Sequence, residues 1–276
     1  MTTPLRRRVL IGVVVVWVVF LVGAPIIALT VGAFSSGFGA VLEALSATDS
    51  VSALAFSLAL ATIAVAVNTV FGTIAAWVLT RDRFRGRTIL LASVDIPFAI
   101  SPVVVGLCFI LLFGPHGWFG PWLKAAGIQI VFSWPAMALA TVFVSLPFVV
   151  REVSLALVEA GTDEEDAART LGASSLAVFW RITLPNIRAG LLNGVLLTSA
   201  RALGEFGAVL VVSGGIAELA ETGTLFVFRA LDDRRDVAAY AMALALAAIT
   251  MAILGALFVV RRRAAHSPVR TREVLR

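Results

Sequence analysis

Six long apolar runs divide this sequence, and each is long enough to cross a lipid bilayer, which takes about 20 apolar residues. The chain of 276 residues is 60% hydrophobic and only 14% charged, whereas a soluble domain carries about 25% charged residues. This excess predicts an all-α membrane protein. A signal peptide has a shorter apolar region, so the first run is expected to be a retained span. The predicted spans cover residues 9–34, 53–79, 88–113, 131–150, 187–212 and 237–260.

Arginines cluster at alternate ends of these runs, and this pattern predicts the orientation. Arginines occur before the first run, in the loop 81–87 and after the sixth run, whereas few basic residues fall on the opposite side. Because loops rich in Lys and Arg stay in the cytoplasm, both termini and the polar stretch 159–185 are predicted to be cytoplasmic. We therefore expect a multi-pass protein of the bacterial cytoplasmic membrane, with a cytoplasmic N-terminus (1–8), a membrane domain (9–263) and a cytoplasmic tail (264–276).

The sequence lacks the residues that most cofactor and nucleotide sites require. Lys124 is the only lysine and follows no glycine-rich loop, so the chain has no P-loop for phosphate binding. Cys108 is the only cysteine, and His116 and His266 lie far apart in sequence. The basic residues sit at the ends of apolar runs and predict no nucleic-acid partner. We expect no bound cofactor or metal, and any ATP chemistry, with its magnesium, to reside in a partner chain.

The stretch 159–185 is the main polar segment between the runs, and its pattern predicts two short helices joined at Gly172. Thr162 and Glu165 have the spacing of a capping box, and the first helix is expected to end near Leu171. Four carboxylates, at positions 163 to 166, complement the positive end of its dipole. An amphipathic hairpin lying on the lipid surface is the alternative, but such helices are usually basic on their polar face.

The second helix of this stretch is expected to extend through Ile182. Ser174 or Ser175 can cap it, and Leu176, Phe179 and Trp180 give it an apolar face. Pro185 follows where the fifth span begins, which is a favoured position for proline.

The third span contains helix-breaking residues and one carboxylate. Pro97 and Pro102 interrupt the apolar run, and within a membrane such breaks occur only where protein or water satisfies the freed backbone groups. Asp95 is expected to cap the helix that restarts after the break, or to pair with a residue on another span. Direct contact with a substrate is a third possibility.

The fifth span carries an opposite-charge pair. Arg201 and Glu205 are four residues apart and share a helix face. Gly190 and Gly194 form a GxxxG pattern that favours close helix packing. Ala200, Gly204 and Ala208 form a stripe of small residues. Charges at this depth cost about 2.5–3.5 kcal/mol each. Two interpretations stay open: a neutralised structural pair, or a pair that lines or gates a pathway for an anion.

The polar stretch resembles the EAA loop of ABC-importer permeases. Asp166-Ala167-Ala168, Gly172 and Ile182-Thr183-Leu184-Pro185 match the spacing of that loop, with Asp166 in place of the usual Glu. In that family the loop is a coupling helix that docks into a groove of the ATP-hydrolysing subunit. The resemblance therefore implies an ATPase-coupling set, which comprises Glu165, Asp166, Ala167, Ala168, Gly172, Leu184 and Pro185.

Three further runs resemble the W-type permease subunit of sulfate/thiosulfate importers. They are the segments 95–103 (DIPFAISPV), 117–122 (GWFGPW) and 200–209 (ARALGEFGAV). The third run is shared with molybdate and tungstate permeases. The resemblance implies a translocation pathway or gate that includes Arg201, Gly204, Glu205, Gly207, Asp95, Pro97 and Pro102.

The same resemblance implies an architecture and partners. We expect six membrane helices in the type I ABC-importer arrangement, with the first helix as a peripheral arm. The expected partners are two ATPase subunits, a second permease subunit of the T-type, a periplasmic or lipid-anchored sulfate-binding protein, and the bilayer. A homodimeric molybdate or tungstate permease is the nearest alternative. A secondary transporter or channel, with Asp95 and Glu205 carrying protons or cations, is a more distant one.

The orientation can be tested with a topology reporter. A reporter fused after Arg263 is expected to be active only in the cytoplasm, because the arginines retain that side. The same cytoplasm-active reporter fused at Lys124 is expected to be inactive, because that loop is predicted to lie on the outer side. The opposite result for the fusion after Arg263 would refute the predicted orientation.

Overall fold

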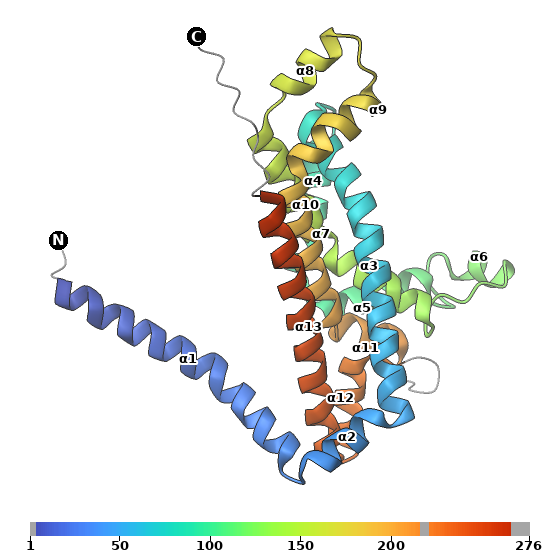
Figure 1. Ribbon diagram of the computed structural model, residues 1–276. Helices are drawn as coiled ribbons and strands as arrows, with labels where there is room; N and C mark the ends of the chain where they lie inside the picture. Colours follow the sequence, from blue (N-terminus) through green and yellow to red (C-terminus); the bar gives the residue numbers. More distant parts are fainter. Residues whose placement is uncertain (1–3, 216–220, 266–276) are drawn as a thin grey trace. The chain divides into compact units, whose positions relative to one another are not determined.

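The structure is a computed structural model that describes residues 4–215 and 221–265, and this part of the chain is helical without a β-strand. The predicted all-α class is therefore confirmed (Figure 1). The helices are α1 Pro4–Phe34, α2 Phe38–Ser46, α3 Thr48–Arg81, α4 Arg87–Ala99, α5 Pro102–Phe113, α6 Gly120–Ala125, α7 Trp134–Ala160, α8 Asp163–Thr170, α9 Ser175–Val178, the π-helix η1 Phe179–Thr183, α10 Leu184–Leu203, α11 Gly207–Ser213, α12 Gly223–Asp232 and α13 Asp236–Ala265.

Among the described residues, α1, α3, α7 and α13 are each long and apolar enough to cross a bilayer as single helices. Two further spans exist if each of two bent helix pairs counts as one, which gives the predicted total of six. α4 and α5 form one pair, bent by 116°, and the helix from Ser175 to Leu203 forms the other with α11, bent by 52°. The prolines thus predicted a break in the third span, but not a corner this sharp.

Two predicted span ends fall well short of the helix ends in the structure. The fourth span was expected to end at Val150, but α7 continues to Ala160. Pro147 lies within α7, and the helix passes through it without ending. The helix of the sixth predicted span, α13, extends to Ala265, so the predicted tail from residue 264 begins inside the helix. Residues 266–276 of that tail lie outside the described residues.

The chain divides into two compact units. The first contains residues up to Leu54 and from Thr222 to Ala248. Its core includes Phe226, Ala239 and Met242, all fully or almost fully buried. Asp49 accepts hydrogen bonds from both terminal nitrogens of Arg235, at 3.2 and 3.1 Å. α1 is exposed along most of its length, and only its end joins the core of this unit, through Ala33.

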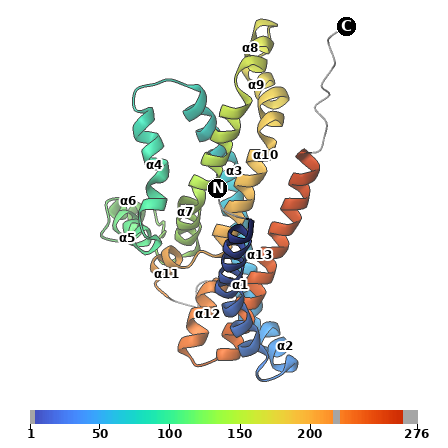
Figure 2. The same ribbon diagram turned by 90° about the vertical axis from the view of Figure 1, so that its left-hand side faces the viewer.

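The second unit covers residues from Ala55 to Glu221 and from Ile249 onward, and α7 and α10 pack together at its centre (Figure 2). A Cβ added to Gly190 would lie 2.5 Å from the Cβ of Ala156, and one added to Gly194 would lie 2.9 Å from the Cα of Val149. The GxxxG pattern therefore does allow close packing, because larger side chains at these positions would push the two helices apart.

Buried polar contacts also join α3 to α7. Asn68 is fully buried, and its amide nitrogen donates to the carbonyl oxygen of Val142 at 3.0 Å and to the hydroxyl of Ser145 at 2.9 Å. Hydrogen bonds of this kind connect helices where the hydrophobic effect between them is weak.

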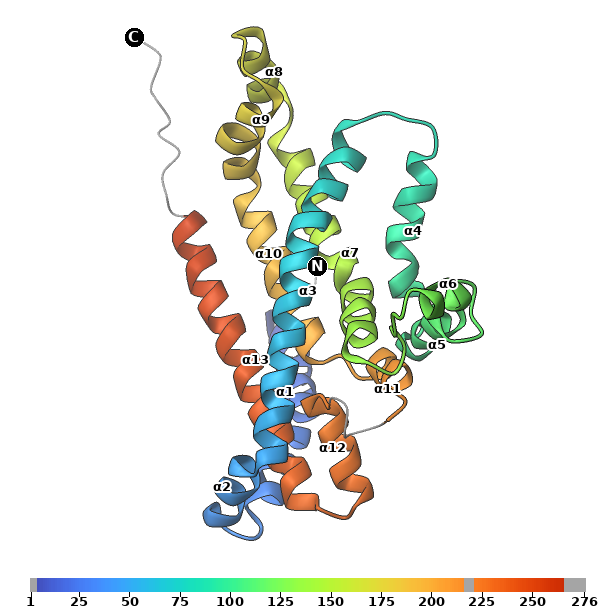
Figure 3. The same cartoon turned by 90° about the vertical axis from the view of Figure 1, so that its right-hand side faces the viewer.

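α5, α6 and α11 gather near one end of α7, away from α8 and α9 (Figure 3). α5 and α11 approach closely at Gly106, where an added Cβ would lie 2.7 Å from Val211 and 2.9 Å from the carbonyl oxygen of Ala208. A Cβ added to Gly207 would lie 3.2 Å from side-chain carbons of Pro102 and Val103. The two broken spans therefore contact each other beside their breaks.

Candidate functional site

The polar stretch forms a hairpin beyond the ends of α7 and α10 (Figures 1 and 2). α8 runs from Asp163 to Thr170, Gly172 adopts a left-handed conformation with φ of +86°, and α9 begins at Ser175. Glycine suits this position because a Cβ disfavours positive φ. The predicted turn at Gly172 between two helices is confirmed.

The caps of this hairpin agree only in part with the prediction. Ser174 caps α9, since its hydroxyl accepts a hydrogen bond from the backbone nitrogen of Ala177 at 3.3 Å. The expected capping box at the start of α8 is wrong, because Thr162 makes no side-chain cap bond and Glu165 turns toward the interior. The second helix does not end at Ile182 either. It continues through the π-helix η1 directly into α10 at Leu184.

Glu165 lies at the centre of a buried polar network. Its Oε1 accepts hydrogen bonds from Nη2 of Arg81 at 3.0 Å and from the hydroxyl of Thr183 at 2.9 Å. Arg81 also donates to the carbonyl oxygen of Gly161. Glu165 is 3% exposed, so its carboxylate connects α8 to the ends of α3 and η1. The side chain of Glu165 is therefore not accessible to a partner, although the resemblance placed Glu165 in the ATPase-coupling set.

The remaining residues of the predicted coupling set have different environments. Asp166 and Ala167 are exposed, and Ala168 is partly buried. Asp166 pairs with Arg169 at 2.9 Å. Leu184 is half-buried against the core of the second unit, and Pro185 is exposed in the first turn of α10. Asp166 and Ala167 are therefore the ones that can contact a partner.

Large apolar side chains are exposed on the same hairpin. Leu171 is 88% exposed, Leu176 69% and Trp180 59%. Apolar residues grouped on a polar segment outside the spans are typical of an interaction surface. Sequence reasoning identified the apolar face of the second helix but not the exposure of Leu171.

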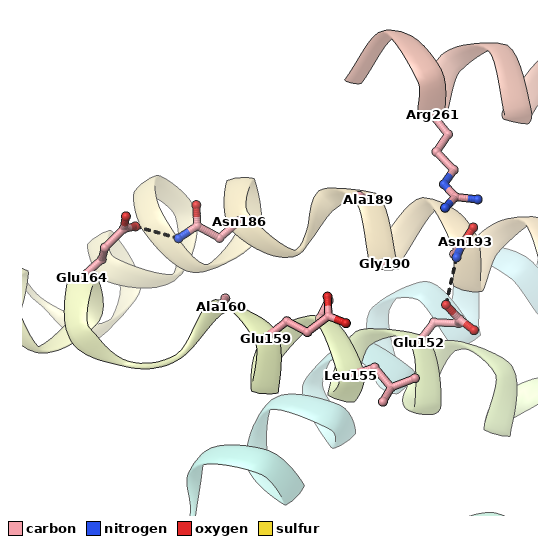
Figure 4. A pocket seen from close by; sticks show the side chains of 11 residues that line it. Glu152, Leu155, Glu159, Ala160, Glu164, Asn186, Ala189, Gly190, Asn193 and Arg261 are labelled. Carbon is pink, nitrogen blue, oxygen red and sulfur yellow. Dashed lines mark hydrogen bonds between the residues drawn. The ribbon is translucent and has the colours of Figure 1, made fainter. Parts of the chain in front are cut away.

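An acidic groove of about 580 Å³ lies between α7 and α10 beside this hairpin (Figure 4). Glu152 accepts a hydrogen bond from Asn193 at 3.0 Å, and Glu164 accepts one from Asn186 at 2.7 Å. Glu159 and Arg261 also line the groove. The first bond adds a polar connection between α7 and α10, which Gly190 and Gly194 bring together, and the second joins α8 to α10.

The predicted pair in the fifth span is formed. Nη2 of Arg201 lies 2.6 Å from Oε2 of Glu205. However, the two residues do not share a continuous helix, because α10 ends at Leu203 and Gly204 is exposed at the break. Glu205 is 3% exposed, and its Oε1 accepts a hydrogen bond from the backbone nitrogen of Ala208 at 2.9 Å. One carboxylate thus binds Arg201 and the first turn of α11.

The expected stripe of small residues in the fifth span is interrupted by this break. Ala200 belongs to α10 and Ala208 to α11, and the two helices are bent by 52°. The periodicity of a single helix therefore does not hold across Gly204.

Asp95 pairs with a residue on another span, as one of the expected alternatives stated. Nη2 of Arg151 in α7 lies 2.8 Å from Oδ1 of Asp95 in α4. The cap of α5 is Ser101 and not Asp95, and Pro102 occupies the first turn of α5. Pro97 is buried within α4.

The sequence analysis did not identify Arg81 and Arg151 as partners of carboxylates. Both lie at the ends of predicted spans, where a charged residue is available for pairing.

Comparison with known families assigns the chain. The model of the family described as "Binding-protein-dependent transport system inner membrane component" matches residues 68–266. The chain belongs to this family. As an inner membrane component it is a transport subunit, and the matched residues include the hairpin of α8 and α9 and the pairs Asp95–Arg151 and Arg201–Glu205.

Curated relatives cover three quarters or more of the chain. A protein of Synechocystis named sulfate transport system permease protein CysW is 46% identical over 94% of both chains. The CysW protein of Escherichia coli K12 is 50% identical over 75% of this chain and 71% of its own length. The CysT protein of the same organism is 37% identical over 90% of this chain and 92% of its own length.

Solved structures share the fold at low sequence identity. A chain of the crystal structure of a bacterial alginate ABC transporter, in complex with alginate pentasaccharide-bound periplasmic protein, matches with a TM-score of 0.80. It is 18% identical and covers 95% of this chain and 96% of its own. A chain of the inward-facing MetNI methionine ABC transporter matches with a TM-score of 0.59 at 18% identity. The match covers 78% of this chain and 95% of the MetNI chain. The predicted ABC-importer permease architecture is therefore confirmed.

Replacing Glu165 by Gln tests the buried network. The free energy of unfolding is expected to fall by about 1.5–3 kcal/mol, because Arg81 loses a charged hydrogen-bond partner. The apparent melting temperature of the chain in detergent measures the effect. Asp166→Asn is the matched control and is expected to change stability by less than about 0.5 kcal/mol. Equal losses for both variants would contradict the distinct role of Glu165.

Proposed function

We propose that this transport component is a permease subunit of an ATP-driven importer that moves sulfate or thiosulfate across the bacterial cytoplasmic membrane by alternating access. The observation that carries the proposal is 46% identity to a sulfate permease over 94% of both chains. A similarity that covers this much of the chain includes the hairpin of α8 and α9, both broken spans and their charged pairs. It is therefore not limited to one shared motif.

The hairpin formed by α8 and α9 is the proposed ATPase-docking element. Asp166, Ala167 and Leu171 are exposed on it, whereas Glu165 holds it to α3 and η1. A helix-in-groove contact suits this surface. ATP binding and hydrolysis with magnesium take place in two partner ATPase subunits, because this sequence has no P-loop. Movement of the docked hairpin reaches α10 through the continuous helix.

The remaining partners and the orientation belong to the same proposal. CysW and CysT proteins both occur among the relatives, which favours a second, T-type permease subunit over a homodimer. A periplasmic or lipid-anchored binding protein delivers the anion. Both termini lie in the cytoplasm, on the side where arginines are abundant.

Arg201, Glu205 and the glycines at 204 and 207 are proposed to line or gate the pathway, together with the break that contains Pro97 and Pro102. The support is that the two breaks contact each other through Gly207 and Pro102. A charge within a membrane segment most often serves transport, and Arg201 stays 28% exposed although Glu205 neutralises it.

Uptake of labelled sulfate tests the function. Cells with this chain are expected to accumulate sulfate when ATP is present, and thiosulfate is expected to compete with it more strongly than molybdate. Cells that lack only this chain provide the control. Uptake that persists without ATP and collapses with the proton gradient would contradict the proposal. Competition by molybdate alone, with two copies of this chain in the complex, would indicate a molybdate permease.

Replacing Leu171 by Asp tests the docking surface. The charged side chain is expected to release the ATPase subunits during affinity purification, because it removes an exposed apolar contact. The apparent melting temperature of the chain is expected to stay unchanged, since Leu171 is 88% exposed. Retention of both ATPase subunits at the parental ratio would argue against docking at this surface.

Replacing Arg201 by Ala tests the pathway. Transport is expected to fall by about tenfold or more, the effect of losing one charged hydrogen-bond donor. The double variant with Glu205→Ala also removes the carboxylate that would lose its arginine, and it is expected to assemble but not to recover transport. Parental transport in either assembled variant would exclude Arg201 from the pathway.

A further inference from the structure

Arg151 is held in one orientation by two neighbours on α4. Its Nε and Nη2 both lie within hydrogen-bond distance of Oδ1 of Asp95, at 2.9 and 2.8 Å. The ring of Phe98 lies against its guanidinium group, 4.6 Å from the ring centre. A guanidinium group has five N–H donors, so the Nη1 edge is left for another acceptor.

The pair is exposed in an apolar surrounding. The side chains of Arg151 and Asp95 are 55% and 50% exposed, and on α4 Ile89 and Ile96 on either side of Asp95 are 72% and 40% exposed. Charged groups among lipid-facing residues are unfavourable, and in membrane proteins they face a water-filled cavity or another protein. We therefore expect this part of α4 and α7 to face a water-filled cavity or another protein.

A cavity lies beside the pair. Its volume is about 350 Å³, and Asp95, Arg151 and Ser154 supply its polar lining. Within the described residues, the buried hydroxyl oxygen of Ser154 has no hydrogen-bond partner. The cavity thus offers a cationic fork and a hydroxyl group, which are the groups that bind oxyanions. Leu91, Val94, Val150, Leu155 and Val158 form the apolar wall.

We propose that Arg151, with Ser154, forms an anion-contact site of the translocation pathway, which binds a tetrahedral oxyanion such as sulfate after it has passed Arg201. The proposal rests on the proposed transport function. The free edge of the guanidinium group donates to two oxygens of the anion, and Ser154 lines the cavity beside it.

The carboxylate beside Arg151 explains how such a site releases its anion. A pathway residue must bind the ion well enough to admit it and weakly enough to let it leave. Asp95 neutralises the guanidinium group when no anion is present and repels the anion when it is bound. The anion therefore binds a guanidinium group whose charge is already partly neutralised, instead of being trapped by an unpaired cation.

The position of Arg151 along α7 places it at a different depth from Arg201. Gly194 of α10 packs against Val149, two residues from Arg151. Arg201 lies seven residues beyond Gly194, which corresponds to about 10 Å along the helix. The chain thus presents two arginine–carboxylate pairs in sequence, with Arg151 on the side nearer the coupling hairpin.

The test uses the complete importer in proteoliposomes that contain ATP, with labelled sulfate supplied by the binding protein. Arg151→Gln is expected to lower the maximal uptake rate by about tenfold or more, whereas the sulfate concentration for half-maximal uptake stays near the parental value because the binding protein sets it. Arg151→Lys is expected to retain part of the rate. Asp95→Asn frees the guanidinium group, so internal sulfate is expected to inhibit uptake at a several-fold lower concentration.

The double variant Asp95→Asn with Arg151→Gln separates this site from a structural pair. Recovery of transport in the double variant, or parental transport by Arg151→Gln, would overturn the proposal and leave a structural or subunit-interface pair. Assembly is checked by size-exclusion chromatography and by ATP hydrolysis in detergent. If Arg151→Gln fails to assemble, Arg151→Lys decides: a reduced rate in an assembled complex supports the site, and a parental rate overturns it.

The parental importer distinguishes the two proposals. If it takes up no sulfate, the proposed function fails and the site loses its sulfate assignment. If it takes up sulfate and the variants at Arg151 behave as the parent does, only the anion-contact site fails.

Discussion

The carboxylate of Glu165 joins three helical segments that are far apart in the sequence. It accepts hydrogen bonds from Arg81 at the end of α3 and from Thr183 at the end of η1, while its own backbone belongs to α8. Removing one member of a buried charged contact leaves the other unsatisfied, which is strongly unfavourable. Glu165 therefore fixes α8 to the end of α3 and to η1, which continues into α10.

The two arginine–carboxylate pairs in the spans, Asp95–Arg151 and Arg201–Glu205, occur in similar positions. Each lies close to a helix break: Glu205 follows the end of α10, and Asp95 precedes the corner between α4 and α5. A break frees backbone groups, and Glu205 satisfies one of them through the nitrogen of Ala208. The same carboxylate neutralises an arginine. Glu205 therefore stabilises both the charge of Arg201 and the backbone at the break. This explains why the charged pair and the break occur in one short segment.

Sequence patterns predicted those features that depend on local chemistry. The apolar runs, the junction of two helices at Gly172 and a serine cap at Ser174 or Ser175 follow from residues that lie close together in the chain. The inward turn of Glu165 was not predictable in this way, because its partner Arg81 is 84 residues away. The prolines at 97 and 102 indicate a break but contain no information on its angle, since packing against α7 and α11 determines the direction of α5.

The π-helical turn η1 has a geometric consequence for the hairpin. A π-helix closes hydrogen bonds between residues five apart, so it accommodates about one extra residue relative to an α-helix. One residue corresponds to a rotation of about 100° around an α-helix with 3.6 residues per turn. The wide turn from Phe179 to Thr183 therefore sets the angular phase between α9 and α10. It allows the exposed apolar face of α9 and the inner face of α10 to point in directions that an uninterrupted α-helix would not permit.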